Sequence, residues 1–307
     1  MVRGVAVMAH ADVSDAALEE AAQRISRQLR RAPEIAANLR LLGVQMHVIG
    51  KDQQVTDLPE YRYLRGVPFE GERTMDERGR GYGGLHASCA EENLLLFSSD
   101  RFADHRDICT HEFAHTVMTF GLSRDMRDKI EAQRQKSVAA GKWKTMYAGA
   151  NAQEFFAELS MWYFGSRGDF GETKPTPTRG ARWLRSYDPE AYELLDSIYS
   201  GRLKPGEIEV TDLAPLPPKT EGQIRSRNDQ PATQVLVINK TSKPIQMYWL
   251  DFEGKRRNYG TVVPGGVSSQ GTYVTHAWLI ESGGKCLGIF VADRTIGRIV
   301  VGGQEKK

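Results

Sequence analysis

Apolar residues recur with a helical period over much of the first two thirds of the chain. Between residues 14 and 39 they lie every three or four positions, which predicts a helix capped by Ser14 and interrupted at Pro33. Similar patterns predict helices at 104–120, 123–140, 152–164 and 189–199. Short apolar runs at 44–49 and 94–97 predict strands, and the polar segment 52–84 predicts a loop or lid.

The pattern changes near residue 211. Four prolines lie between residues 211 and 232, which indicates a linker. From residue 233 onward, short apolar runs separated by Gly, Asn and Ser predict a small β-sandwich or barrel. We therefore expect an α+β chain, with a mainly helical domain at 1–210, a Pro-rich linker at 211–223 and a small all-β sandwich at 224–307.

The helix predicted at 104–120, with Asp104 as its N-cap, contains the sequence HEFAH at 111–115. His111 and His115 are four residues apart, so they lie on one helix face and can bind the same metal ion. Glu112 can act as the general base of a zinc peptidase. The alternative is two ordinary histidines on a core-facing helix. We favour the zinc site because a candidate third ligand follows.

A catalytic zinc ion usually has three protein ligands and a water. The next acidic candidates are Glu154 and Glu158, which share a face of the helix predicted at 152–164. One can bind zinc while the other orients an imidazole. Glu154 is also spaced from Asn151 as in a capping box, a purely structural role. Tyr147 can donate a hydrogen bond to an oxyanion or can simply be a packing residue.

These residues resemble the anthrax lethal factor and Pro-Pro endopeptidase group of zinc peptidases. The resemblance covers residues 93–163 and rests on HEFAH followed by Tyr147 and, seven residues later, Glu154. It implies a gluzincin-like, zincin-type fold and one catalytic zinc ion. It further implies zinc ligands His111, His115 and Glu154, the base Glu112 and the oxyanion donor Tyr147. Glu158 then takes the orienting role.

Composition limits the other functions. The net charge of +2 over 307 residues argues against a nucleic-acid partner, which needs a strongly basic surface. No apolar run approaches the length of a membrane span, and we see no signal peptide. A peptidase of this kind is nevertheless expected to be secreted or extracytoplasmic. Cys89 and Cys109 can pair as a disulfide or remain free buried thiols.

The C-terminal part resembles the β domain of the von Hippel–Lindau (VHL) tumour suppressor. The matching positions are Arg225-Ser226, Gln234-Val235, Ile238-Asn239, Trp249 to Gly254, Tyr259, Pro264-Gly265, Tyr273, His276 and Trp278-Leu279. In that family the domain binds hydroxyproline in an extended peptide. The resemblance implies a pocket of Tyr259, Thr272, His276 and Trp278, in which Thr272 replaces a serine. No helical domain for ubiquitin-ligase subunits follows, so we expect no such partner.

Together these features predict a zinc metalloendopeptidase whose C-terminal module holds a proline- or hydroxyproline-containing protein substrate. Two alternatives stay open. One is a peptide-binding protein with an inactive zincin domain, which the intact Glu112 disfavours. The other is a structural zinc site, which normally needs four protein ligands where only three are visible.

Overall fold

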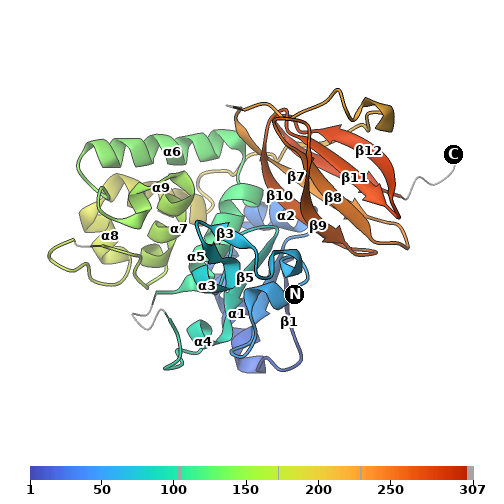
Figure 1. Cartoon of the computed structure of the whole chain (residues 1–307). Coiled ribbons are helices and arrows are strands. Elements are labelled where there is room, and N and C mark those ends of the chain that lie inside the picture. The colour runs from blue at the N-terminus through green and yellow to red at the C-terminus, as the bar shows by residue number, and fades with distance from the viewer. Residues whose placement is uncertain (102–105, 172, 229, 303–307) are drawn as a thin grey trace. The chain divides into compact units, whose positions relative to one another are not determined.

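The computed structural model describes residues 1–101, 106–171, 173–228 and 230–302, except the side chains of residues 69 and 70. Two compact units divide the chain: Met1–Leu58 with Phe69–Ile208, and Pro59–Pro68 with Glu209–Lys307. Helices dominate the first unit and strands the second (Figure 1), so the chain is α+β, as predicted. The helical unit ends at Ile208, close to the expected boundary at 210.

The first unit contains a parallel sheet of order β1-β2-β5. Its strands are β1 (Ala6–Ala9), β2 (Gln45–Ile49) and β5 (His86–Ala90). The helices are α1 (Asp15–Leu29), α2 (Pro33–Leu42), α3 (Met75–Arg78), α4 (Glu91–Leu94), α5 (Ile108–Thr116), α6 (Arg124–Ala139), α7 (Ala152–Tyr163), α8 (Ala181–Tyr187) and α9 (Pro189–Tyr199). Shorter elements are η1 (Val55–Asp57), β3 (Pro68–Glu70), β4 (Arg73–Thr74), the π-helical η3 (Val117–Gly121) and η4 (Tyr147–Gly149).

Most predicted helices of this unit form as expected, because polar residues cap them. Ser14, Ser123 and Asn151 each accept a hydrogen bond from a backbone N–H in the first turn of α1, α6 and α7. Pro33 does more than interrupt a helix, since it begins a second one, α2, where its missing N–H costs nothing. The sequence did not indicate β1 or α8.

The prediction of a strand at 94–97 was wrong. Leu94 ends the short helix α4, and residues 95–97 form a turn. The strand that precedes the HEFAH helix is β5, whose sequence HASCA is too polar to show an apolar run. Four of its five residues are buried because the strand lies in the core of the unit, with α5 packed against it.

The second unit is a sandwich of two four-stranded sheets (Figure 1), as predicted. Their orders are β10-β7-β13-β6 and β12-β11-β8-β9. The buried cluster that includes Val237, Met247, Trp278 and Ile299 forms the main core, with members from both sheets. The strands are β6 (Val210–Asp212), β7 (Ala232–Asn239), β8 (Ile245–Leu250), β9 (Arg256–Val262), β10 (Val267–Tyr273), β11 (Ala277–Ser282), β12 (Lys285–Val291) and β13 (Ile296–Val301).

The segment expected to be a linker, 211–223, differs from that expectation. Its first residues belong to β6, which pairs with β13 in a parallel ladder. Leu216 then forms a bridge with Ile289, and η5 (Pro218–Thr220) follows. The prolines at 215, 217 and 218 follow β6 and so remove no donor from its ladder, and Leu213 packs against the core of the sandwich.

The strand unit also takes in Pro59–Pro68, which includes the single turn η2 (Arg62–Leu64). The Tyr63 ring lies against Gly260 of β9, where a Cβ would come within 2.6 Å of ring atom Cδ1. The hydroxyl of Tyr63 lies 3.4 Å from Nε2 of Gln270 in β10. Tyr63 therefore contacts an edge strand of each sheet, a contact that no sequence pattern indicated.

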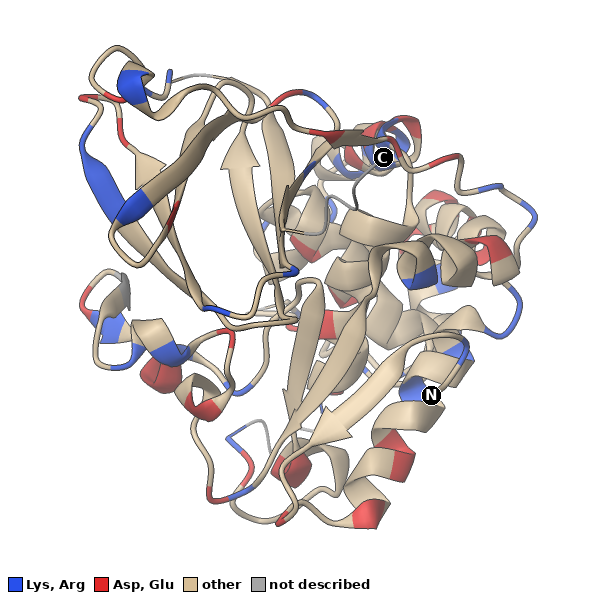
Figure 2. Ribbon diagram, turned by 90° about the vertical axis from the view of Figure 1, so that its right-hand side faces the viewer, with Lys and Arg blue, Asp and Glu red and all other residues tan. Residues whose placement is uncertain are grey.

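Charged residues of both signs lie interspersed along the helices of the first unit (Figure 2). Within the described ranges, no helix is both long enough and apolar enough to cross a lipid bilayer.

Candidate functional site

The HEFAH segment lies on α5, whose start is fixed by Asp107. The Asp107 carboxylate accepts hydrogen bonds from the backbone N–H of Thr110 at 3.0 Å and from its hydroxyl at 2.9 Å. Asp107, which lies next to the helix, is therefore its N-cap, whereas the expected cap, Asp104, lies outside the described residues. The helix continues as η3 to Gly121, the expected end. A Cβ at Gly121 would come within 2.8 Å of Ile35, so glycine lets α2 pack closely here.

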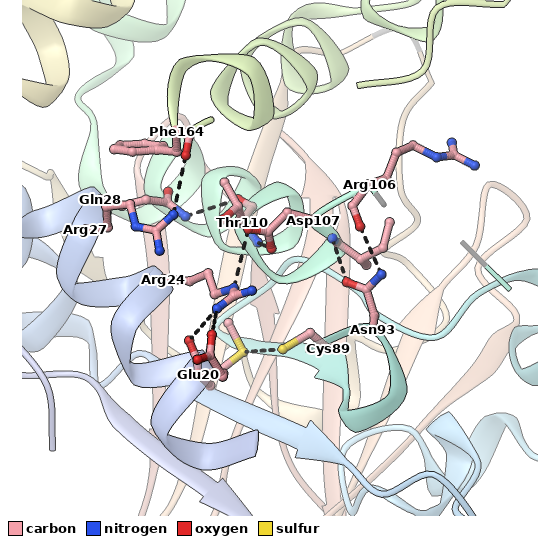
Figure 3. Close-up of polar contacts among 12 residues, drawn as sticks. Glu20, Arg24, Arg27, Gln28, Cys89, Asn93, Arg106, Asp107, Thr110 and Phe164 are labelled. Atoms are coloured by element: carbon pink, nitrogen blue, oxygen red, sulfur yellow. Dashed lines mark hydrogen bonds and ion pairs between the residues drawn. The ribbon is translucent and has the colours of Figure 1, made fainter. Parts of the chain in front are cut away.

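Side chains of α1 hold α5 from behind (Figure 3). Arg24 lies between Glu20 and the Asp107 carboxylate, with its Nε 3.4 Å from Asp107 Oδ2. Gln28 donates a hydrogen bond of 3.1 Å to the carbonyl of Thr110. From the side of α4, Asn93 accepts a hydrogen bond from the N–H of Ile108 at 3.0 Å. These bonds fix the first turn of the helix that carries both histidines.

His111, His115 and Glu154 converge on one point. The two Nε2 atoms lie 3.0 Å apart, and Oε2 of Glu154 lies 3.3 Å from Nε2 of His111 and 3.4 Å from Nε2 of His115. Asn151 caps α7 by accepting from the Glu154 N–H at 2.9 Å, so the backbone of Glu154 belongs to the cap. Its carboxylate is free of that role and faces the histidines.

The spacing of these three atoms fits a zinc ion. Ligands at roughly 2.0–2.1 Å from a tetrahedral zinc ion lie roughly 3.3 Å from one another. Among the described residues, Oε2 of Glu154 is buried and makes no hydrogen bond of acceptable geometry, although both imidazoles lie near it. A buried carboxylate oxygen without a donor is costly. A divalent cation held between these atoms would remove that cost.

Each imidazole also has a polar partner at its other nitrogen. Glu158 Oε1 lies 3.2 Å from Nδ1 of His111, and Gln153 Oε1 lies 3.3 Å from Nδ1 of His115. The contact between His111 and Glu158 is close but lacks hydrogen-bond geometry. An acceptor facing Nδ1 favours the tautomer with hydrogen there, which leaves the lone pair of Nε2 for a metal. Two Nε2 atoms 3.0 Å apart cannot both present lone pairs to each other, so a proton or a metal ion must lie between them. Sequence reasoning indicated Glu158 but missed Gln153, because no motif marks it.

The electrostatics also favour a cation. Burial works against the charged imidazolium of His111, but Glu154, Glu158 and Glu112 outweigh it and raise its pKa to about 10. Burial likewise works against the charged carboxylate of Glu154, but the two histidines outweigh it and hold its pKa well below the ordinary value. The arrangement thus places negative charge around the point where the three ligand atoms meet.

Glu112 and Tyr147 lie beside this point. A carboxylate oxygen of Glu112 and a ring nitrogen of each histidine lie within 4.8 Å of one another. Tyr147 begins η4 and is 40% exposed. Burial, followed by the negative charge of Glu154, raises its pKa to about 12. The phenol therefore keeps its proton at neutral pH and can donate it in a hydrogen bond.

A glycine-rich segment lies against the same face of α5. Tyr82 pairs with Ser88 of β5 through backbone hydrogen bonds of 3.2 and 2.8 Å. A Cβ at Gly83 would collide with the side chain of His115, and a Cβ at Gly81 would come within 3.2 Å of Glu112 Cγ. The missing side chains let this segment, part of the expected loop or lid, approach the HEFAH motif closely.

The cysteines do not form a disulfide. Cys89, Cys109 and Cys286 are free, and the first two are buried. Burial raises the pKa of the Cys89 thiol well above its ordinary value, so the thiol stays protonated. Of the two alternatives, the structure shows free buried thiols.

Three residues of the expected peptide pocket contact one another in the second unit, and His276 is linked to them through Trp249. The Trp278 indole N–H donates to the Thr272 hydroxyl at 3.1 Å, and the ring centroids of Tyr259 and Trp278 are 5.0 Å apart. His276 lies with its ring centroid 5.2 Å from that of Trp249. Trp278, Thr272 and His276 are buried and Tyr259 is partly exposed, so little of this pocket is open to solvent.

Trp249 is one of the positions that resemble the VHL domain, but it was not predicted to line the pocket. Its indole N–H is buried and has no hydrogen-bond partner among the described residues. The same holds for the hydroxyl of Thr275, the residue before His276, whose φ of 73° is strained for a β-branched side chain. Unpaired donors and local strain next to His276 are typical of a binding site.

Comparison with known proteins adds two findings. Residues 224–294 match the VHL beta domain family, so the predicted resemblance of this part is confirmed. The structure of a Pro-Pro endopeptidase from Paenibacillus alvei, PPEP-2, is 21% identical in sequence. The match covers 62% of this chain and 96% of that one, with a TM-score of 0.44. A structural similarity this low does not indicate an activity, and the resemblance of residues 93–163 to zinc peptidases stays a prediction.

Proposed function

We propose that the protein is a zinc-dependent endopeptidase. The observation that carries this proposal is the convergence of two imidazole nitrogens and one carboxylate oxygen at 3.0–3.4 Å, the oxygen having no hydrogen-bond partner among the described residues. His111, His115 and Glu154 would hold the ion, which supplies Lewis-acid activation of water and of the scissile carbonyl. Three ligands leave a position open, whereas a structural site normally has four protein ligands.

The chain's own residues would carry the proton transfers. Glu112 accepts a proton from the attacking water and delivers it to the leaving amine. Tyr147 donates a hydrogen bond to the oxyanion that forms on the carbonyl carbon. Glu158 and Gln153 keep the two imidazoles in the tautomer that binds a metal.

Replacement of the base tests this proposal. Glu112→Ala should keep zinc, because Glu112 is not a ligand, and should lose hydrolysis of casein and of a quenched-fluorescent peptide library. The measurements are turnover with and without a chelator and zinc content by mass spectrometry. Glu190→Ala is a matched control, since Glu190 lies on α9 and pairs with Lys136. Full activity in Glu112→Ala would refute the assignment.

The same experiment distinguishes the alternative, a peptide-binding protein with an inactive zincin domain. That alternative predicts no turnover by the wild-type protein with any peptide of the library. Absence of zinc from the purified, unchelated protein would contradict the peptidase proposal.

We also propose that the second unit binds proline- or hydroxyproline-containing peptides. Support comes from the match of residues 224–294 to the VHL beta domain and from the cluster of Tyr259, Thr272, His276 and Trp278. Burial lowers the pKa of His276, so its imidazole is neutral at pH 7 and can share a hydrogen bond with a hydroxyl. The Thr272 hydroxyl accepts from Trp278 and keeps its own proton to donate.

Isothermal titration of the full chain with matched hydroxyproline and proline peptides tests this second proposal. Tighter binding of the hydroxyproline peptide is expected, because proline would leave the buried polar groups unpaired. Equal binding of the two peptides, or no binding, would overturn the proposed hydroxyproline-binding role of the second unit and leave the peptidase proposal intact.

A further inference from the structure

Arg78 lies within reach of the hydroxyl of Tyr147, the candidate oxyanion donor. It is the last residue of α3, and its Nη2 lies 3.5 Å from the hydroxyl oxygen of Tyr147. The guanidinium carbon also lies 5.9 Å from the centroid of the Tyr82 ring, in the glycine-rich segment against α5. Arg78 thus contacts both the segment beside the HEFAH helix and the phenol beside the metal ligands.

The helix that carries Arg78 is held firmly despite its four residues. Thr74 and Glu77 form a capping box at its start. The Tyr82 hydroxyl donates to the carbonyl of Met75 at 2.9 Å. Arg101 donates to the carbonyls of Asp76 and Glu77, each at 3.1 Å. The direction from which Arg78 approaches Tyr147 is therefore set by several independent bonds.

The chemistry of the two groups decides the direction of the hydrogen bond. A guanidinium group only donates, so the oxygen of Tyr147 must be the acceptor on the side of Arg78. A phenol has one proton, which must then point elsewhere. The ring lies close enough to Glu154 for the two to interact, and the proton is thereby directed towards the metal ligands. A distance of 3.5 Å is at the long end for a hydrogen bond, but such bonds often shorten when substrate binds.

We propose that Arg78 is a positioning residue that orients the hydroxyl proton of Tyr147 towards the carbonyl oxygen of a peptide substrate. The positive charge next to the phenol also makes it a better donor to a developing oxyanion. This role rests on the proposed peptidase function, because the hydrogen bond from Tyr147 to the oxyanion is made only in the transition state of peptide hydrolysis.

A double-mutant cycle on the full-length, zinc-loaded protein tests the role. The probe is the fastest-cleaved peptide of the quenched-fluorescent library. Arg78→Gln should lower kcat by about 10- to 100-fold. KM should change by less than about threefold, since ground-state binding is unaffected. In a Tyr147→Phe background the same substitution should cost less than about twofold, because there is no hydroxyl left to orient. Arg78→Lys, which keeps a cationic donor, should recover part of the loss.

Arg202→Gln is the matched control, since Arg202 pairs with Glu193 and Asp196 of α9 and takes no part in the support of α3. Any loss it causes should be the same in both backgrounds. An equal loss from Arg78→Gln with and without the Tyr147 hydroxyl would overturn the positioning role, as would no loss at all. If Tyr147→Phe causes no loss of kcat, Tyr147 is not the oxyanion donor, and Arg78 then has no hydroxyl to position. A wild-type protein that cleaves no peptide would instead refute the proposed function.

Discussion

The two residues behind the histidines should contribute unequally to zinc affinity. Glu158 is 2% exposed, lies 3.2 Å from Nδ1 of His111 and accepts from the N–H of Asp169 at 2.5 Å. Gln153 offers a neutral amide oxygen at 3.3 Å from Nδ1 of His115. The substitutions Glu158→Leu and Gln153→Leu each remove the whole acceptor, so they compare a charged partner with a neutral one.

The difference in magnitude follows from the charge. Loss of an outer partner of a metal-binding histidine typically weakens metal affinity by about 10- to 100-fold. Hydrogen bonds to charged groups are roughly twice as strong as neutral ones. If Glu158→Leu weakens zinc binding by about 10- to 100-fold, Gln153→Leu should cost half that free energy, or about 3- to 10-fold.

Zinc affinity should be measured by competition with a chromophoric chelator at one pH, after confirming by thermal unfolding that each zinc-loaded variant folds. Glu190→Leu serves as the control for removal of a carboxylate away from the site, since Glu190 lies on α9 and pairs with Lys136. The reasoning is refuted if Glu158→Leu changes the affinity by less than about twofold, or if Gln153→Leu costs more than Glu158→Leu.

Three other predictions concern protonation, peptide discrimination and packing. Because the pKa of His111 is raised to about 10, the metal-free imidazole is charged at pH 8, so zinc binding there should release about one proton. Titrations in buffers of different ionisation enthalpy measure this, and no release would contradict it. Thr272→Val should reduce the preference for hydroxyproline over proline by about 10-fold while Thr272→Ser retains it, as judged by calorimetry. Gly260→Ala, at φ +93° and against the Tyr63 ring, should lower the free energy of unfolding by about 1–3 kcal/mol. The loss should be smaller in a Tyr63→Ala background, and an equal loss in denaturant unfolding would show that the contact is unimportant.

Local signals made much of the helical unit predictable. The caps Ser14, Ser123 and Asn151 lie immediately before the helices they begin, and the spacing of His111 and His115 is itself a helical repeat. Interactions within four residues along the chain therefore indicate both the element and the shared face. The pairing of Glu154 with the histidines needed a resemblance as well, because its spacing from Asn151 was compatible with a cap alone.

The remainder depends on contacts between distant residues. Gln153 and His115 are 38 positions apart, and Arg78 and Tyr147 are 69 apart. No local pattern specifies such pairs. β5 was missed because burial within the sheet, and not an apolar sequence, defines it. Tyr63 lies more than 190 residues before Gly260, so its place in the strand unit could not be inferred from composition.

X-ray absorption at the zinc edge of the purified protein tests the central claim most directly. The account predicts one zinc ion per chain, bound only by nitrogen and oxygen at roughly 2.0–2.1 Å, with the scattering pattern of two imidazoles. A sulfur ligand at roughly 2.3 Å, or protein that takes up no zinc, would contradict it.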